Sequence, residues 1–428
     1  MLQTDPLYLA CVQILKEELV PAMGCTEPIA VAYAAAKARS ALGCLPDEVI
    51  IGCSGSIIKN VKSVVVPNTG GMRGLEAAAA AGIIAGDQDK KLEVISHVSE
   101  AQLPRIRDYL SNTRFRIDHL QGKKVFEILL TVKKGNDTAL VHIEDTHTNI
   151  VLIERNGKAL FRSGTSGSCT PAGADRSVLT VAGIYDFCCS LETEDVRSVL
   201  ERQIQYNMAI AEEGMARPYG ANIGKTLLLA NGGQDAPVSI RARAMAAAGS
   251  DARMYGCSLP VVINSGSGNQ GITVSVPVVI YAREYGKSEQ ELFRALALAN
   301  LIAIQQKTYI GTLSAFCGAV SAGVGAGAGI AYLMGGDLKT VSHTVANALA
   351  IISGMVCDGA KPSCAAKISQ AVEVGIFGWQ MYENGQQFRA GDGLVVKGVD
   401  ENVKNVGRLG REGMNDTNRE IIDMMIGK

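Results

Sequence analysis

Three cysteines in the last third of the chain have the residue type and the surroundings to bind a metal. Cys317 lies in a stretch of small residues, and Cys357 and Cys364 enclose the segment Asp-Gly-Ala-Lys-Pro-Ser. Thirty-nine residues separate the first two cysteines and six separate the last two. Thiolates are soft ligands that suit an iron–sulfur cluster or zinc. The three cysteines could therefore hold one such centre between them.

Two other interpretations compete with this one. Structural zinc usually takes four ligands in two tight pairs, and the loose spacing here does not supply them. Cysteines in helical domains are also often small buried hydrophobes. Asp358, Lys361 and Pro362 nevertheless form a polar, turning segment in an otherwise apolar region, which buried cysteines alone do not need. The spacing by itself leaves the cluster, zinc and packing roles open.

A second chemical candidate lies in Gly24-Cys-Thr-Glu-Pro28, directly before a predicted helix over 29–42. Cys25 would then lie at a helix N-terminus, where the dipole lowers a thiol pKa and favours the thiolate. Glu27 offers a carboxylate in the same turn, and either group could act as a general base. The structural alternative makes Thr26 a helix cap and Cys25 a packed thiol.

Three short polar segments could bind a charged ligand: 54–56, 67–71 and 264–271. The first two are turns whose backbone N–H groups could face a carboxylate, particularly where a helix follows, as predicted over 75–85. The third combines glycines with amides and hydroxyls, which suits an anion or an amino acid, although turns of this kind are often plain connections. The candidate side chains are Ser54, Ser56, Asn68, Thr69, Ser265, Ser267, Asn269 and Gln270.

The elements that position these residues predict an α+β protein. A mainly helical bundle is expected from residues 1–89 and 165–428, with an antiparallel α+β module inserted at 90–164. In the module, a helix is expected over 100–111, and the hairpin signal Asn156-Gly157 separates two of its strands. His142 and His147 are interpreted as sheet or surface residues, and 164–171 as the loop that leaves the module. The strands are expected at 92–97, 115–120, 125–132, 139–144, 150–155 and 158–161, and the later helices at 178–190, 194–216, 237–248, 272–282, 289–306, 339–353, 365–384 and 418–426, with one more around Cys317.

Composition excludes several classes of protein. The chain has 428 residues and a net charge of −1, without the basic footprint of a nucleic-acid-binding protein. Residues 308–336 contain no charge, but glycine, alanine and serine dominate them, so a buried bundle helix is expected there and no membrane partner. Eleven cysteines and an N-terminal segment without the pattern of a signal peptide predict a cytoplasmic protein with reduced thiols.

The motifs together resemble the L-cysteine desulfidase family of UPF0597-type proteins, which is similar to the iron–sulfur L-serine dehydratases. The similarity runs from end to end and rests on a small set of segments. They are Gly24-Cys-Thr-Glu-Pro28, Pro67-Asn-Thr-Gly-Gly71, Ser265-Gly-Ser-Gly-Asn-Gln-Gly271, Phe316-Cys-Gly318 and Cys357-Asp-Gly-Ala-Lys-Pro-Ser-Cys364. A short turn between the last two cysteines and a C-terminus without cysteine favour the desulfidase branch.

The resemblance implies a [4Fe–4S] cluster held by Cys317, Cys357 and Cys364, and β-elimination of L-cysteine to pyruvate, ammonia and hydrogen sulfide. The iron without a cysteine ligand would act as a Lewis acid. Cys25 is the first candidate for the general base and Glu27 the second, while a competing hypothesis makes Cys25 a reversible fourth ligand. The substrate carboxylate is expected at Ser54–Ser56 or Asn68–Thr69, and its ammonium at 265–270. L-serine is the rival substrate, an amino-acid-binding protein without catalysis is the alternative function, and a homodimer is compatible with the sequence.

Overall fold

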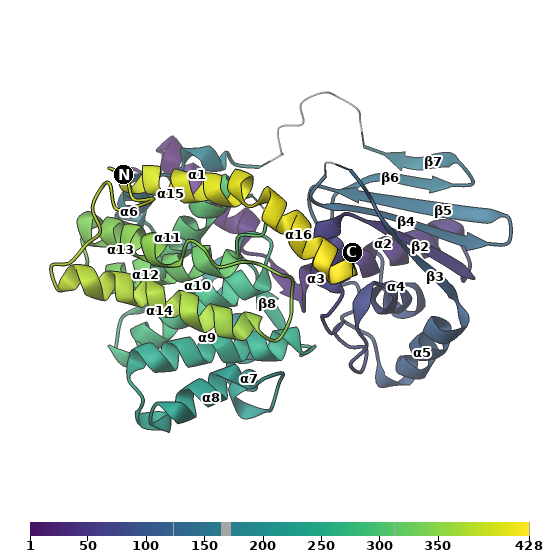
Figure 1. Cartoon of the computed structure of the whole chain (residues 1–428), viewed down its shortest axis with the longest axis horizontal. Coiled ribbons are helices and arrows are strands. Elements are labelled where there is room, and N and C mark those ends of the chain that lie inside the picture. Colours follow the sequence, from purple (N-terminus) through teal and green to yellow (C-terminus); the bar gives the residue numbers. More distant parts are fainter. Residues whose placement is uncertain (123, 164–172, 312, 428) are drawn as a thin grey trace.

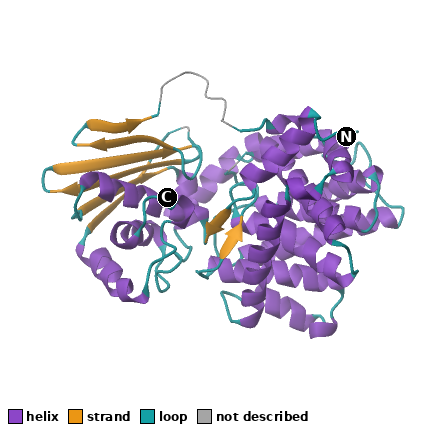
Figure 2. Ribbon diagram, turned by 180° about the vertical axis from the view of Figure 1, so that it is seen from behind, coloured by secondary structure: helices purple, strands orange, loops and turns teal. Residues whose placement is uncertain are grey.

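The chain folds into a helical bundle beside a sheet that carries its own helices (Figures 1 and 2). The computed structural model describes residues 1–122, 124–163, 173–311 and 313–427. Helix α16 (Asn415–Ile426) returns from the bundle and packs against α3 (Gly55–Val61) near the sheet (Figure 1). The predicted α+β class with a mainly helical part is confirmed, and the expectation for 164–171 lies outside the described residues.

Small residues let the bundle helices approach until their backbones touch. A Cβ atom on Gly327 of α12 would lie only 2.2 Å from the carbonyl oxygen of Gly375 in α14. This contact explains why the uncharged stretch of 308–336 is rich in glycine, and none of the described helices is long and apolar enough to cross a membrane. The bundle helices are α1 (Pro6–Glu18), α6 (Val181–Ser190), α7 (Arg197–Ala216), α8 (Ile223–Ala230), α9 (Val238–Met254), α10 (Gly268–Glu284), α11 (Glu289–Ile310), α12 (Gly318–Leu333), α13 (Leu338–Ile352), α14 (Cys364–Glu383) and α15 (Val399–Arg408).

The sheet has six strands in the order β3-β2-β4-β5-β6-β7. β2 pairs in parallel with β3 and antiparallel with β4, so the prediction of a purely antiparallel sheet is wrong at this edge. Parallel neighbours need a long crossover, and the helices between β2 and β3 provide it. The strands are β2 (Glu48–Cys53), β3 (Arg114–His119), β4 (Glu127–Lys134), β5 (Asp137–Glu144), β6 (Ile150–Arg155) and β7 (Lys158–Arg162).

The helices α2 (Thr26–Leu42) and α4 (Gly74–Ala85) share one apolar core with the sheet, and α5 (Leu103–Asn112) packs on α4. The sequence pattern placed the start of the sheet module near residue 90, whereas the packing places it at Thr26. The difference arises because β2 is an interior strand of the sheet although it precedes residue 90. Residues 1–89 are therefore divided between the bundle, through α1, and the sheet, through α2 to α4.

Most of the other predicted elements are present, but one predicted strand is wrong and several short elements were missed. The strand predicted at 92–97 is wrong, because 91–93 form a short 3-10 turn whose backbone bonds are local. Residues 272–282 are helical within α10, as predicted, although Pro277 lies inside that helix. The helices α8 and α15 were not predicted. A two-stranded pair of β1 (Pro21–Met23) and β8 (Pro260–Val262) joins the two parts beside the Cys25 turn.

Candidate active site

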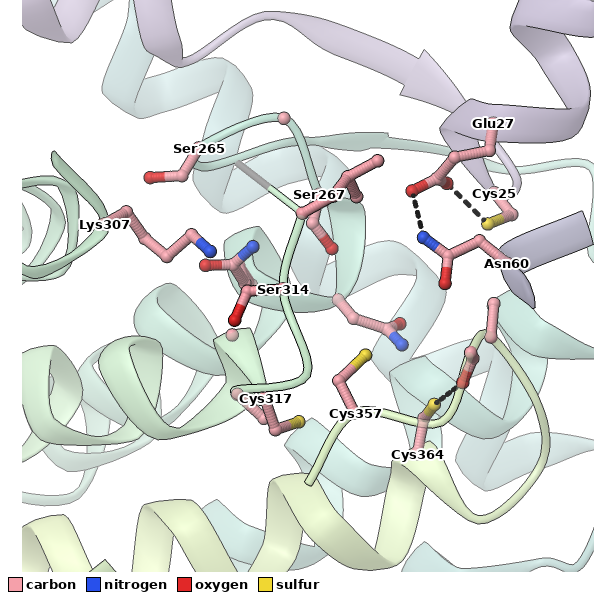
Figure 3. A pocket seen from close by; sticks show the side chains of 18 of the residues that line it. Cys25, Glu27, Asn60, Ser265, Ser267, Lys307, Ser314, Cys317, Cys357 and Cys364 are labelled. Atoms are coloured by element: carbon pink, nitrogen blue, oxygen red, sulfur yellow. Dashed lines mark hydrogen bonds between the residues drawn. The ribbon is translucent and has the colours of Figure 1, made fainter. Parts of the chain in front are cut away.

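One cavity of about 110 Å³ brings together residues that are far apart in the sequence. The Cys25 turn, the 265–270 loop and the three predicted cysteine ligands all line it. In Figure 3, Cys317, Cys357 and Cys364 lie on one side of this space and the group of Cys25 and Glu27 lies across it. The Cys25 turn thus lies against the cysteine region within one chain, as a base role for Cys25 requires. A homodimer stays a prediction.

The three cysteines are held by two helix starts and a short backbone bridge. Cys317 is the N-cap of α12, and Cys364 is the first residue of α14. Cys357 is fixed between them because its N–H donates to the Ala315 carbonyl at 2.6 Å, next to a bridge between 316 and 356. Helix N-termini favour negative charge, so both helices suit thiolate ligands.

The thiols cannot all ionise without a bound cation. A hydrogen bond with Cys317 and nearby Lys59 lower the pKa of Cys357 to about 5, against the effect of burial. The same pair interaction, together with burial, raises the pKa of Cys317 well above its usual value, and burial raises that of Cys364. Such a set of one thiolate and two thiols loses its remaining protons when metal ions bind. The donor set therefore fits an iron–sulfur cluster.

Across the cavity, Cys25, Glu27 and Asn60 form a hydrogen-bonded group. Cys25 is the N-cap of α2, as predicted, and its Sγ donates to Glu27 Oε2 at 3.0 Å. Asn60 Nδ2 donates to the other carboxylate oxygen at 2.9 Å. Thr26 donates both to Glu27 and to the Gly266 carbonyl, which ties the turn to the 265–270 loop. The thiol and the carboxylate therefore share one proton path at the cavity wall (Figure 3).

The predicted direction of the Cys25 pKa is wrong. Burial, and then the adjacent Glu27 carboxylate, raise the pKa of Cys25 well above its usual value and outweigh the helix N-terminus. Burial alone would raise the pKa of Glu27, but His147, the Cys25 hydrogen bond and Arg253 together lower it. In the resting site the carboxylate is ionised and the thiol holds its proton.

Residues 265–270 reach the cavity as predicted, although 268–270 form the first turn of α10 and not part of a loop. Ser265, Ser267, Asn269 and Gln270 all line it. The Gln270 side chain lies directly against Gly318. A Cβ atom added to Gly318 would lie only 2.6 Å from Cδ of Gln270. Gly318 follows Cys317, so this glycine leaves room for the amide beside a predicted ligand.

The structure does not bring the other four predicted binding residues to this cavity. Ser54 donates to the Val125 carbonyl at 2.8 Å, and Ser56 is buried in α3. Asn68 donates to the Ile95 carbonyl at 3.0 Å, and Thr69 donates to the Val66 carbonyl at 2.7 Å. The side chains of Ser54, Asn68 and Thr69 thus bind backbone carbonyls, and none of the four residues lines the cavity.

Four further residues line the cavity although sequence reasoning missed them: Asn60, His147, Arg253 and Lys307. The interpretation of His147 as a sheet or surface residue is wrong: it follows β5 in a turn and is buried, with its ring edge-on to Phe126 at 4.7 Å between centroids. Burial lowers the pKa of Lys307 to about 8. Single polar residues without a surrounding motif give no local signal, and only the fold shows that they converge.

Comparison with known proteins identifies the family. Residues 89–423 match the model of the serine dehydratase alpha chain family. The chain belongs to this family. The serine dehydratase alpha chains are lyase-type enzymes that generally depend on iron–sulfur chemistry, which agrees with the donor set of the cavity. The resemblance that the motifs predicted is confirmed at this level.

Full-length relatives show that the chain is also a member of the UPF0597 proteins. The chain is 53% identical over 428 residues to a UPF0597 protein of Desulfitobacterium hafniense, covering 100% of this chain and 99% of the relative. It is 49% identical to a UPF0597 protein of Lachnoclostridium phytofermentans, with 98% and 100% coverage. A UPF0597 protein of Treponema denticola is 45% identical, with 97% coverage of both chains. Because the similarity spans whole chains, it includes the Cys25 turn before residue 89.

Proposed function

We propose that this lyase eliminates the β-substituent of L-cysteine and that Cys317, Cys357 and Cys364 bind a [4Fe–4S] cluster for the reaction. The products are pyruvate, ammonia and hydrogen sulfide. The observation that carries the proposal is the placement of the Cys25–Glu27 group across one buried cavity from the three thiols. An α-proton must leave on one side of such a substrate and a sulfur on the other.

A cluster held by Cys317, Cys357 and Cys364 would supply a Lewis-acidic iron, whose chemistry is to stabilise negative charge on a departing sulfur. The chain's own residues handle the protons. Glu27 accepts the Cys25 thiol proton along the 3.0 Å hydrogen bond, and the resulting thiolate takes the α-proton of the substrate. The electron pair of the broken C–H bond forms the Cα–Cβ double bond, and the pair of the broken C–S bond leaves with sulfur. Asn60 holds Glu27 in position throughout.

Aminoacrylate is the first product of this elimination. Water converts it to pyruvate and ammonia, so it needs no further group from the protein. L-serine would follow the same course with hydroxide as the leaving group, which is a poorer one than hydrogen sulfide. Pyruvate formation from both amino acids at equal concentration measures the preference, and we expect L-cysteine to be the faster substrate.

The decisive experiment uses protein purified without oxygen. Visible absorbance, iron and sulfide content are recorded first, and pyruvate and sulfide are followed after L-cysteine is added. A brown protein with four irons that forms both products supports the proposal. A colourless protein that resists cluster reconstitution and forms no pyruvate would refute it.

Replacement of Cys25 by alanine separates the two roles considered for this residue. If Cys25 is the base, the variant keeps the cluster absorbance and loses turnover by about 100-fold or more. If Cys25 is a fourth ligand, the absorbance itself changes. Cys53→Ala is the matched control, since Cys53 is also a buried thiol but lies in β2 and does not line the cavity.

A further inference from the structure

Arg253 is a buried cation that forms no ion pair with any residue the structure describes; Glu27, whose pKa it helps to lower, acts on it only from beyond hydrogen-bond distance. Its side chain lines the cavity, and the residue is only 2% exposed near the end of α9. It makes no hydrogen bond or ion pair with any described residue, and its Nε is buried without a partner. Arg243, on the same helix, is also buried but pairs with Glu373 at 2.6 Å. A buried charge without a partner is costly, so Arg253 marks a place for a missing anion.

The protein's own carboxylates do not fill this place. Glu27 is the acidic residue of the cavity wall, and its oxygens already accept hydrogen bonds from Asn60, Cys25 and Thr26. Residues 123, 164–172, 312 and 428, which the structure does not describe, include no aspartate or glutamate. A ligand of the cavity could therefore supply the close acidic partner that Arg253 lacks among the described residues.

The guanidinium is held in place by the backbone of the 265–271 loop. A Cβ atom on Gly268 would lie 2.4 Å from Arg253 Nε and 2.8 Å from its Cζ. Any side chain at position 268 would occupy the space of the guanidinium. The glycine at the start of α10 thus allows the guanidinium to lie close to the backbone of the segment that lines the cavity.

Two acceptors of the same cavity also lack donors. Asn269 Oδ1 and Gln270 Oε1 are buried without a hydrogen-bond partner among the described residues. An ammonium group offers three N–H donors, and a carboxylate accepts the fork of an arginine. Unpaired donors and unpaired acceptors in one small cavity match the two charged groups of an α-amino acid.

We propose that Arg253 binds the α-carboxylate of the amino-acid substrate and that Asn269 and Gln270 accept hydrogen bonds from its ammonium group. The proposal rests on the proposed function for its substrate class. It gives the carboxylate a different partner from the turns at 54–56 and 67–71, whose side chains are engaged with backbone. The site would require both charged groups of the ligand, and would discriminate against thiols that lack either one.

The test measures binding of L-alanine, which has both charged groups but no β-leaving group. Ethylamine and propionate are the probes that lack the carboxylate and the ammonium group, respectively. On full-length, cluster-loaded wild-type protein, isothermal titration is expected to give at least about 10-fold tighter binding of L-alanine than of either fragment. Equal affinity for L-alanine and ethylamine overturns the carboxylate role, and equal affinity for L-alanine and propionate overturns the ammonium role.

Variants then assign the carboxylate to Arg253. Arg253→Gln is expected to weaken L-alanine binding and raise the KM for L-cysteine by about 10- to 100-fold, with ethylamine binding unchanged. Arg253→Lys restores part of the affinity because it keeps the charge. Arg243→Gln is the matched control, and it should lose stability through the broken pair with Glu373 while L-alanine binding stays the same. Without ligand, Arg253→Gln should be at least as stable as the wild type, which a structural arginine would not allow.

If Arg253→Gln lowers kcat and leaves KM unchanged, Arg253 acts only through Glu27, and the proposal is refuted. If this variant does not fold, Gly268→Ala displaces the guanidinium without removing it and should weaken L-alanine binding in the same way. The failure of the proposed function is distinguishable, because L-alanine binding requires no turnover. Wild-type protein that binds L-alanine through Arg253 but forms no pyruvate refutes the lyase proposal alone.

Discussion

Replacement of Lys59 by methionine tests whether this buried lysine joins the cysteine region to the rest of the protein. Lys59 is 2% exposed in α3. Its Nζ donates to the carbonyls of Ser314 and Cys357 at 3.3 and 3.1 Å, and to Asn418 Oδ1 at 2.8 Å. A Cβ atom on Gly359 would lie 2.3 Å from the Lys59 carbonyl oxygen. The backbone of α3 therefore also touches the segment between Cys357 and Cys364, called the cysteine loop below.

Two opposing effects decide how much the free energy of unfolding falls in Lys59→Met. Three acceptors lose a charged donor, and each buried acceptor left unpaired costs about 1–3 kcal/mol. The opposing effect is the desolvation of the ammonium, which burial imposes and which lowers the pKa of Lys59. Methionine relieves that desolvation and fills a similar volume. We therefore expect Lys59→Met to lower the free energy of unfolding by about 2–4 kcal/mol, less than the sum over three acceptors.

Urea unfolding at pH 7, followed by circular dichroism, measures this loss, and absorbance after anaerobic reconstitution measures cluster uptake. Lys16→Met is the control, because Lys16 is an exposed lysine of α1 without a hydrogen bond or ion pair to any described residue, and its loss should change stability by no more than about 0.5 kcal/mol. Asn418→Ala removes one of the three partners and should cost about 1 kcal/mol. A loss below about 1 kcal/mol in Lys59→Met, together with normal cluster uptake, would refute the reasoning.

Three further predictions follow from single residues. Burial raises the pKa of Asp251 to about 6, so the folded protein favours the neutral carboxyl. The contribution of this carboxyl to the free energy of unfolding is fully present below about pH 4 and is lost as the pH rises through 6. Asp251→Asn, which keeps an acceptor for the Gly224 N–H, should therefore gain about 1–2 kcal/mol over wild type at pH 8 after allowance for solvent screening, with about half of that gain at pH 5 and little at pH 4, as urea unfolding across these pH values would show. Gly375→Ala places a Cβ atom 2.1 Å from the Gly323 carbonyl and should cost about 2–4 kcal/mol by separating α12 and α14. Gly354→Ala, where nothing lies within 4 Å, is its control, and equal melting temperatures would contradict the packing argument. Glu27→Gln should keep the cluster absorbance but lower pyruvate formation by about 100-fold or more, and full activity in this variant would exclude Glu27 from proton transfer.

The sequence predicted the parts of the site that form compact motifs. The Cys357–Cys364 segment and the Cys25 turn are polar stretches inside apolar surroundings, so their residue types alone suggest chemistry. The 265–270 loop was found for the same reason. The turns at 54–56 and 67–71 have a similar composition, but their polar groups bind backbone carbonyls, which composition cannot distinguish from ligand binding.

Isolated residues and long-range pairings escaped prediction. Arg253 and Lys59 are single cations on helices, where most such residues face solvent, and only contacts with distant elements bury them. The place of β2 in the sheet escaped prediction for a related reason. Its partner β3 follows more than sixty residues later along the chain, and parallel pairing leaves no turn signal. The direction of the Cys25 pKa depended on burial and on Glu27, which the helix-start argument did not include.

The hydrogen bond from Thr26 to the Gly266 carbonyl joins residues 240 positions apart. Closing so long a loop is entropically costly and slow, and contacts of this range form late in folding. The cysteine loop and α16, which meets Lys59, lie further still along the chain. The cavity is therefore complete only after nearly the whole polypeptide has been synthesised. Iron and sulfide must then be delivered to an almost fully folded acceptor, and a chain truncated before Cys364 should acquire no colour under conditions that load the full protein.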